Sequence, residues 1–544
     1  MNFNPNDLYG ILPALILTAG ALVLLVSEVF LRGVNPQQLG PAGGPVTSPA
    51  LVPQGPEGRP AAEAAIHQLP TAPTDEPAPD RRYQAWLAAA FAAAGLWAAL
   101  AQTGDPTLSL FSGAAVSDGF ARVVAAVVCA SLLLSCVVAF SYLESLQATR
   151  GEFYALALFS ASGMCLLAQA TDLIVIFIAL EVMSLAVYAL CAYLRRGKRP
   201  AEAAFKYFIL GSFASAIFLY GAALAFGATG STRIADVAAA LRAGGPSGAG
   251  TLLFASVALL ASGFGFKVAA VPFHMWVPDV YDGAPAPVTG FMAAGVKAAG
   301  FATLVRILVS GFGDPAAALG SHGWRELVIW LAILTMLTGN LLAVPQRSVK
   351  RMLAYSSIAH AGYLLVAVAS MGTAAPRADA AEGLLFYLAA YGATVIGAFG
   401  VVAVIERKLA LSGRGDDLSS WAGLSEKHPA LAAAMSLFMI SLAGVPPTAG
   451  FMAKVVVFRS AIEANLAPLA IFGVLTSAAG LYYYLRVVVY VYMVPSAKPE
   501  AVQGGRLLGA GLAIAGCALL VIWLGVQPSA LATLTQSAAS AFAR

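Results

Sequence analysis

The chain has 544 residues, of which 59% are hydrophobic and 11% are charged, and its mean hydropathy is +0.80. Soluble domains carry about 25% charged residues, so most of this chain is not dissolved in water. The formal net charge of +4 comes from basic residues in scattered short loops, which is not the signature of a nucleic-acid-binding protein. The five cysteines are isolated within apolar runs and form no C-x-x-C pair, so neither an iron–sulfur cluster nor a zinc site is expected.

Apolar runs of about 20 residues recur along the whole chain, and each is long enough to cross roughly 30 Å of hydrocarbon as a helix. They are far longer than the strands of a membrane barrel, so the sequence predicts an all-α polytopic membrane protein. The seventh run continues as a short segment past Pro272, and the twelfth is interrupted at Pro446-Pro447, which predicts two broken helices. We expect about fourteen spans, near residues 8–31, 83–103, 115–142, 152–170, 172–194, 202–228, 251–271, 287–311, 325–344, 350–370, 381–405, 430–465, 467–494 and 506–526.

The distribution of basic residues predicts how the chain is oriented in the membrane. Arg and Lys gather in the loops that follow odd-numbered spans, as in RRGKR at 195–199, and are sparse on the other side. This bias places both termini on the periplasmic face of a bacterial inner membrane. Residues 33–80 are rich in Pro, Gly and Ala and poor in aromatics, so we expect a flexible cytoplasmic loop there.

Ionisable residues deep inside apolar spans are the most informative feature of the sequence. A charge at the middle of a span costs about 2.5–3.5 kcal/mol on insertion scales, so several together would cost as much as the net stability of a whole protein. Such residues are by default candidates for a functional site. They are Glu181, Lys206, Lys267, Lys297, His360 and Lys454.

Two structural explanations of these charges remain open beside a functional one. Long side chains can reach the headgroups, which suits Lys206, because it lies one turn from the interface and can pair with Glu202 at i,i+4. This explanation fails for Lys297 and Lys454, which lie about ten residues, or 15 Å, from either end of their spans. A static buried ion pair with Glu181 can neutralise one lysine, but the other central lysines would then have no acidic partner.

A proton relay accounts for all of these residues. A lysine without a counter-charge in a low-dielectric site can load and lose a proton near neutral pH, and a glutamate beside it can tune that exchange. Lysines, a glutamate and a histidine at mid-membrane depth, with water between them, are therefore suited to moving protons. No metal site is expected, because lysine is a poor ligand and the histidines do not cluster.

The two predicted breaks lie close to two of the buried lysines. Pro272 follows Lys267 by five residues, and Pro446-Pro447 precedes Lys454 by seven. Interrupted helices in corresponding halves of a transporter indicate its ion pathway. PVTGFMAAGVKAAG at 287–300 also echoes PPTAGFMAKVVVF at 446–458, which is either an internal repeat or chance. His274, just past the first break, is either a proton feeder or a hydrogen-bonded helix-break residue.

Three stretches of the chain resemble a known family. They are GFKVAAVPFHMWVPDVYDGAPAPVTGFMAAGVKAAGF (265–301), KRMLAYSSIAHAGYLL (350–365) and SLAGVPPTAGFMAKVVVF (441–458). These stretches resemble the antiporter-like membrane subunits of respiratory complex I (NADH:quinone oxidoreductase), and PDVYDGAPAPVT most resembles the N-type subunits. The resemblance covers nearly all the spans from about 115 to 495, and the 33–80 loop departs from the family's usual short connection.

The resemblance implies a particular fold, with fourteen transmembrane helices and two inverted five-helix repeats. The repeats would occupy residues 151–311 and 325–494. The remaining segments would be a first helix in 1–32, the loop at 33–80, the second and third spans in 81–150, and the last helix and tail in 505–544.

The resemblance also implies roles for individual residues. Glu181 and Lys267 match a buried pair in which the glutamate modulates the proton affinity of the lysine. Lys297 matches the connecting lysine of the central axis, and Lys454 matches the terminal lysine on the second broken helix. Lysine at 454, where M-type subunits have glutamate, favours the N type, and the lack of a long lateral helix after the last span argues against the L type. Two further positions, Lys206 and His274, match polar residues implicated in proton uptake or relay, and His360 is a further candidate.

The function implied is proton translocation coupled to quinone reduction in other subunits. The chain would be part of an enzyme without carrying a redox centre, and NADH, FMN, iron–sulfur clusters and quinone would bind to partner subunits. The expected partners are neighbouring antiporter-like and small membrane subunits and membrane lipid, with no nucleic acid. The alternative is an Mrp-type cation/proton antiporter subunit without redox coupling. An inert scaffold would give no reason for the insertion cost of the buried lysines.

Overall fold

A computed structural model describes residues 4–31, 82–146, 148–194, 198–243, 249–313, 323–372, 377–409, 417–495 and 508–543. In this part of the chain, twelve helices are long and apolar enough to cross a membrane, and two shorter apolar helices, Leu12–Glu28 and Pro429–Ala443, accompany them. The predicted all-α, multi-pass membrane architecture is therefore confirmed. The count of fourteen spans and the inverted repeats stay predictions, and the loop at 33–80 lies outside the described residues.

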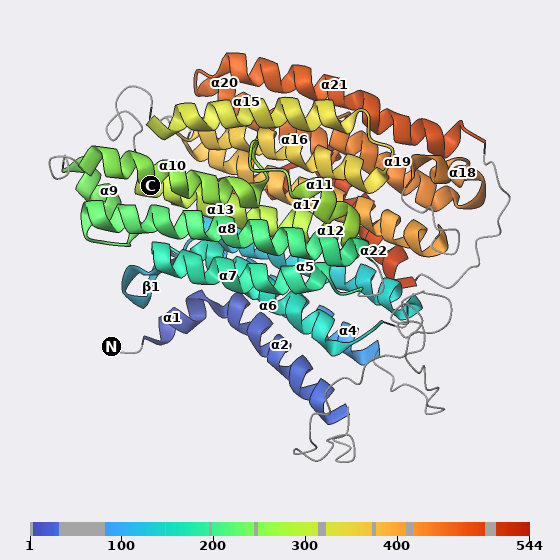
Figure 1. The fold of residues 1–544 in the computed structure, drawn as a ribbon, viewed down its shortest axis with the longest axis horizontal. Helices are drawn as coiled ribbons and strands as arrows, with labels where there is room; N and C mark the ends of the chain where they lie inside the picture. Colours follow the sequence, from blue (N-terminus) through green and yellow to red (C-terminus); the bar gives the residue numbers. More distant parts are fainter. Residues whose placement is uncertain are drawn as a thin grey trace, which may run out of the picture.

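The long helices run roughly side by side along one direction (Figure 1). In chain order they are α2 (Leu12–Leu31), α4 (Arg82–Ala101), α5 (Gly119–Ser145), α6 (Gly151–Gln169), α7 (Leu173–Cys191), α8 (Lys198–Thr229), α10 (Ala249–Val268), α12 (Ala286–Phe291) continuing through η3 (Met292–Val296), α13 (Lys297–Val305) and η4 (Arg306–Gly311), α15 (Gly323–Ala343), α16 (Val349–Ser370), α17 (Arg377–Leu409), α19 (Pro429–Ala443), α20 (Ala449–Glu463), α21 (Ala467–Tyr492) and α22 (Leu508–Val526). The segments η3 and η4 are π-helical.

Shorter elements connect these helices or lie at the ends of the bundle. They are α1 (Pro5–Gly10), β1 (Leu108–Leu110), η2 (Phe111–Gly113), β2 (Ala115–Ser117), α9 (Ile234–Arg242), α11 (Val277–Gly283), η6 (Leu418–Trp421), α18 (Leu424–Lys427) and α23 (Ser529–Ala543). The strands β1 and β2 form an antiparallel hairpin in which Leu108 pairs with Ser117. This hairpin, α1 and α9 lie at one end of the bundle, the hairpin end, whereas α18 lies at the opposite end, the α18 end (Figure 1).

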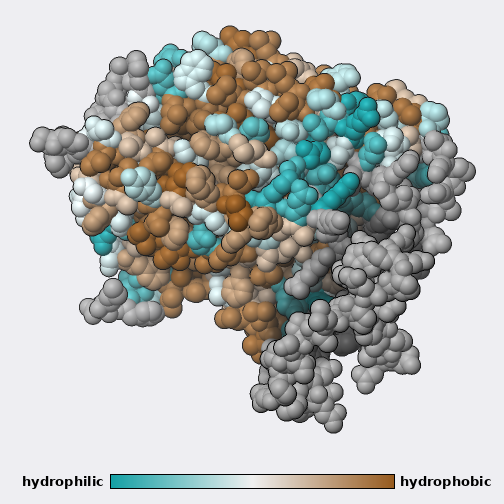
Figure 2. Space-filling view, in the orientation of Figure 1, coloured by the Kyte–Doolittle hydropathy of each residue, from teal (hydrophilic) through white to brown (hydrophobic). Residues whose placement is uncertain are grey.

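Three helical segments form the centre of the bundle. In the segment 286–311, α16 and α17, at least 94% of the apolar window is buried, against 39% or less in α8, α15, α21 and α22. The outer helices expose large apolar side chains such as Phe213, Leu475 and Leu519. Figure 2 shows such hydrophobic residues across much of one face of the molecule. Exposing so much apolar surface to water would be unfavourable, so these faces are suited to contact with lipid or with other membrane helices.

Both predicted helix breaks are present. The helix α10 ends at Val268, and the chain is irregular until α11 begins at Val277. Two hydrogen bonds hold this irregular segment, because the Trp276 indole donates to the Phe266 carbonyl at 2.9 Å and the Val271 amide donates to Thr335 Oγ1 at 2.9 Å.

The second break separates α19 from α20. Here α19 ends at Ala443, and α20 begins after the two prolines. The next residue after α19, Gly444, has a φ of 85°, in the left-handed region that favours glycine. The break leaves the last carbonyls of α19 without partners inside their own helix. These carbonyls are therefore available to side chains from other elements.

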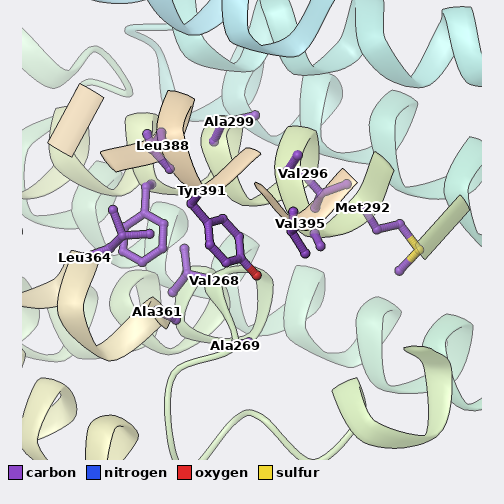
Figure 3. Close-up of a cluster of buried hydrophobic side chains, with 14 of the residues drawn as sticks. Val268, Ala269, Met292, Val296, Ala299, Ala361, Leu364, Leu388, Tyr391 and Val395 are labelled. Atoms are coloured by element: carbon purple, nitrogen blue, oxygen red, sulfur yellow. The ribbon is translucent and has the colours of Figure 1, made fainter. Parts of the chain in front are cut away.

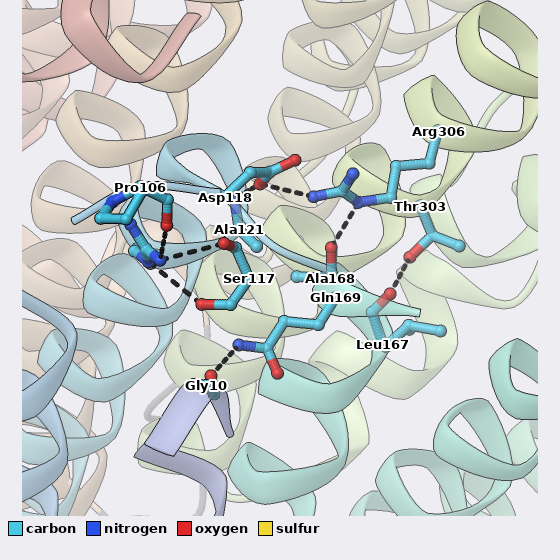
Figure 4. A network of polar contacts seen from close by, with 11 residues as sticks. Gly10, Pro106, Ser117, Asp118, Ala121, Leu167, Ala168, Gln169, Thr303 and Arg306 are labelled. Atoms are coloured by element: carbon cyan, nitrogen blue, oxygen red, sulfur yellow. Dashed lines mark hydrogen bonds and ion pairs between the residues drawn. The ribbon is translucent and has the colours of Figure 1, made fainter. Parts of the chain in front are cut away.

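A buried polar network near the hairpin end joins η4, α6 and α5 (Figure 4). The Arg306 guanidinium donates to Asp118 Oδ1 at 2.7 Å and to the Ala168 carbonyl at 2.6 Å. It also lies 5.7 Å from the ring centroids of Phe120 and of Phe542 in α23. The Asp118 carboxylate therefore satisfies a buried cation while it caps α5.

Replacing Asp118 with alanine should destabilise the fold strongly. The Arg306 charge would stay buried without its counter-charge, and such a loss costs about 3–5 kcal/mol. Unfolding of the purified protein in detergent measures the change. Glu463→Ala, which breaks the exposed Arg459–Glu463 pair, is the control and should have a small effect. Equal effects of the two substitutions would contradict this account of the network.

Candidate functional site

Lys267 lies in the last turn of α10, directly before the first break. Its side chain is buried, and its Nζ donates to Ser184 Oγ at 2.8 Å and to the Tyr188 hydroxyl at 3.1 Å, both on α7. The rings of Tyr188, Tyr207 and Phe266 lie within 5.2–5.6 Å of the same nitrogen. The ammonium group is thus held by two hydroxyls and by aromatic faces, which attract cations.

Glu181 lies on α7 one helical turn before Ser184, so it is on the same side of that helix as the group that binds Lys267. Among the described residues, its Oε1 is buried without a hydrogen-bond partner, and no ion pair within 4.0 Å joins it to Lys267. The two charges nevertheless interact through space. The structure therefore places the predicted acid on the side of α7 that Lys267 contacts.

Lys297 follows the π-helical segment η3, a feature frequently found at functional sites. Its buried Nζ donates to the carbonyl and the hydroxyl of Ser357 on α16, the hydroxyl at 2.7 Å. The same nitrogen lies 5.2 Å from the ring centroid of Tyr391 on α17. Lys297 thus connects the central segment to both of the other central helices.

His360 lies in the middle of α16, one turn beyond Ser357. Its Nδ1 is 2.6 Å from the Tyr387 hydroxyl and its Nε2 is 3.1 Å from the Tyr484 hydroxyl. In a neutral imidazole one ring nitrogen donates and the other accepts, so the ring can pass a proton from one side to the other.

The His360 ring lies between two of the buried lysines. Its centroid is 4.9 Å from the ring of Tyr391, which faces Lys297, and 5.6 Å from the ring of Tyr363, which faces Lys454. The charges of both lysines act on the imidazole. His360 therefore links the two lysines across the centre of the bundle.

Lys454 lies on α20, directly after the second break. Its buried Nζ donates to the carbonyls of Leu442 and Ala443, at 2.8 and 2.9 Å, and to Ser477 Oγ at 2.7 Å. All three donors of an ammonium group are satisfied by this set. The two carbonyls belong to the C-terminal end of α19, which carries the negative end of the helix dipole and stabilises a cation.

The region between Lys267 and Lys297 is mostly apolar. Figure 3 shows Tyr391 surrounded by hydrophobic side chains, among them Val268 and Val296. The Tyr391 hydroxyl is buried and has no hydrogen-bond partner among the described residues. Helix α10 passes close to α13, because a Cβ built at Gly300 would lie 3.7 Å from the Lys267 Cβ. The backbones of α10 and α13 thus approach each other here, whereas the hydrogen bonds of Lys297 go to Ser357 on α16.

Lys206 belongs to a different cluster from the buried lysines. Its side chain is 41% exposed, and the predicted pair with Glu202 is confirmed at 2.7 Å. It also binds Asp279 Oδ2 at 2.8 Å, and Arg351 binds Asp279 Oδ1 at 2.8 Å. Burial alone would raise the pKa of Asp279, but the hydrogen bonds from Lys206 and Arg351 lower that pKa below its ordinary value. The structure therefore places Lys206 in an exposed ion-pair cluster away from the central line.

His274 lies in the first break and is half-buried. Among the described residues its Nδ1 has no hydrogen-bond partner, and no hydrogen bond joins it to a buried lysine. Its two predicted roles both stay open.

Sequence reasoning missed the residues that hold the lysines. Ser184, Ser357 and Ser477 are ordinary helix residues in the sequence, and their spacing alone gives no signal. Asp279 carried a usable signal, because it lies in the PDVYDGAPAPVT motif directly after a break. No group of three or more His, Cys, Asp or Glu side chains suited to a metal ion occurs within the described ranges.

A multi-pass helical bundle with buried ionisable residues beside two broken helices is typical of membrane proteins that translocate ions. The chain belongs to the NADH:quinone oxidoreductase/Mrp antiporter transmembrane family, whose sequence model matches residues 170–480.

Relatives of known name cover most of the chain. It is 43% identical to the protein named NADH-quinone oxidoreductase subunit N of Myxococcus xanthus, over 99% of both chains. Its fold matches a chain of respiratory complex I from Thermus thermophilus with a TM-score of 0.68 and 35% identity, over 83% of this chain and 94% of that one. A chain of the Mrp complex from Dietzia matches with a TM-score of 0.73 over 85% of this chain and 92% of that one, but at 23% identity this likeness shows the fold alone.

Replacing Asp279 with asparagine should lower stability in a pH-dependent way. Since the folded-state pKa is lowered, the carboxylate stabilises the fold above its unfolded-state pKa of about 3.9, and this contribution is lost as the pH falls through the folded-state value. The melting temperature of Asp279→Asn should therefore lie below that of the parent at neutral pH and approach it at acid pH. Asp236→Asn, outside this cluster, is the control. A difference from the parent that does not change with pH would contradict the role of Asp279.

Proposed function

We propose that this chain is the N-type proton-translocating membrane subunit of an NADH:quinone oxidoreductase, and that quinone reduction in partner subunits drives protons through it. The observation that carries the proposal is the line of buried groups from Lys267 through Lys297 and His360 to Lys454. The likeness to named N-type subunits over nearly the whole chain supports the same conclusion.

Each buried lysine has a distinct role in the proposed relay. Glu181 biases the proton affinity of Lys267 through space, because the two charges are close but not in contact. Lys297 exchanges its proton with the hydroxyl of Ser357, and His360 passes protons between its two tyrosine partners. Lys454 is the last carrier, held by the carbonyls of α19.

Water has to take part in this relay. The apolar surroundings of Tyr391 interrupt direct contact between Lys267 and Lys297, so a proton needs mobile water to cross there. Repulsion between neighbouring charged lysines would then move protons in one direction. Lys206 and His274 are further from this line, and we assign them to proton uptake at the surface.

The remaining chemistry belongs to partner subunits. NADH, flavin, iron–sulfur clusters and quinone would bind there, and the neighbours of this chain would be other antiporter-like and small membrane subunits. The distribution of basic residues supports a periplasmic location of both termini, and therefore of the hairpin end, in a bacterial inner membrane. The Mrp-type alternative is weaker, because its structural match is at 23% identity, whereas the complex I match is at 35%.

Lys267→Met and Glu181→Gln should each reduce NADH-driven proton pumping of the assembled complex by about tenfold or more, since a positioned proton-transfer group contributes at least that much. Pumping is measured in proteoliposomes together with NADH oxidation and with assembly of the complex. Lys427→Met, which removes an exposed lysine on α18, is the matched control and should pump like the parent. Normal pumping by an assembled Lys267→Met complex would refute the assigned role.

Gly444→Ala should impair Lys454 without removing it. A Cβ at position 444 would lie 2.9 Å from the Lys454 Nζ, and the φ of 85° strains any side chain there. The ammonium group would lose its contacts with α19, and we expect proton pumping to fall. Gly511→Ala on α22 is the control, because no atom lies within 4 Å of its Cβ position. Unchanged pumping in Gly444→Ala would show that the α19 carbonyls are dispensable.

A further inference from the structure

A second buried charge pair lies at the α18 end of the central helices, outside the proposed relay. Lys350 Nζ is 2.8 Å from Glu406 Oε1, and the two side chains are 4% and 15% exposed. Lys350 also donates to the Ala284 carbonyl at 2.8 Å, and the Tyr142 hydroxyl donates to Glu406 Oε2 at 3.4 Å. Glu406 is therefore the partner that solvent reaches, and Lys350 is the buried one.

Stability alone does not explain this pair. Lys350 lies in the first turn of α16, where a cation opposes the helix dipole. A buried ion pair also recovers little more than its own desolvation cost, and well-packed apolar residues often do as well or better. Because stability does not account for this pair of ionisable groups, a role in proton transfer is the better explanation.

Lys350 lies on the same side of α16 as the residue that binds Lys297. Lys350 and Ser357 are seven residues apart, which places them on the same side of the helix and about 10 Å from each other. Ser357 is the residue that binds Lys297. Buried Tyr281 lies on α11, which packs against α16, and it precedes Ala284, which binds Lys350, by one turn. Polar side chains thus lie along α11 and α16 between the α18 end and the central lysine, on a line that does not pass Lys267.

We propose that Glu406 and Lys350 form a proton-loading pair that supplies Lys297 from the α18 end of the bundle. This inference rests on the proposed function. The Lys350 ammonium releases a proton, through the hydroxyls of Tyr281 and Ser357 and water between them, to a neutral Lys297. Glu406 takes a proton from water and passes it to the neutral Lys350. Each step breaks one N–H or O–H bond and forms another, and no electron is transferred.

A purely mechanical role makes a different prediction. Ser348 donates to Asp282 at 2.8 Å and Arg351 to Asp279 at 2.8 Å, so the start of α16 is fastened to the segment around α11 at several points. As part of this clasp, Lys350 would need only its charge and its hydrogen bonds. Arginine supplies both but does not release its proton in proteins. Lys350→Arg therefore separates the two roles.

The test uses the assembled complex in proteoliposomes, with pumping and NADH oxidation measured together. Lys350→Arg, Glu406→Gln and Tyr281→Phe should each lower proton pumping by about tenfold or more. Lys427→Arg is the matched control and should pump like the parent. Tyr281→Phe removes a single oxygen, so it keeps the test available if Lys350→Arg fails to assemble.

Two outcomes overturn different parts of the account. If Lys297→Met abolishes pumping while assembled Lys350→Arg and Tyr281→Phe complexes pump like the parent, the loading pair is wrong and the proposed function stands. If Lys297→Met itself pumps normally, the proposed function fails, and the loading pair fails with it.

Discussion

The burial of positive charge at membrane depth is the constraint on which this structure depends. An ammonium group inside a helical bundle must find oxygen atoms or aromatic faces to replace water. The three central lysines find them in serine hydroxyls, backbone carbonyls and tyrosine rings. The second break leaves the carbonyls of Leu442 and Ala443 without partners in their own helix, and Lys454 binds both of them.

The nature of these partners matters for function. Among the described residues, no carboxylate lies within 4.0 Å of Lys267, Lys297 or Lys454, and neutral dipoles hold all three. Lys297 and Lys454, which are held by neutral dipoles, can lose a proton without leaving an unpaired anion beside them. The Lys350–Glu406 pair is different, because it joins an acid that solvent reaches to a buried base. The first arrangement suits carriers inside the bundle, and the second suits a group that collects protons from outside.

The sequence indicated those features that have a large free-energy cost in a lipid bilayer, namely charged residues and helix breaks inside apolar spans. Long apolar runs made the multi-pass helical fold predictable. Lysines and prolines in the middle of these runs are conspicuous, so the breaks near Pro272 and Pro446-Pro447 and the position of the lysines at membrane depth could be predicted as well. The groups that hold the lysines could not, since serines and tyrosines are common in such helices and only tertiary packing selects Ser357 or Tyr391. Lys350 carried no such signal because it lies at the first position of the predicted 350–370 span, and its partner Glu406 is 56 residues away in the sequence.

His360 is the residue on which the continuity of the line depends, because its ring lies between the tyrosines that face Lys297 and Lys454. The most direct measurement is therefore NADH-driven proton pumping by the assembled His360→Phe complex, in which a phenyl ring without nitrogen atoms replaces the imidazole. The account predicts that pumping is lost although all the lysines are present. Pumping at the parental level in this complex would contradict a proton path through the centre of the bundle.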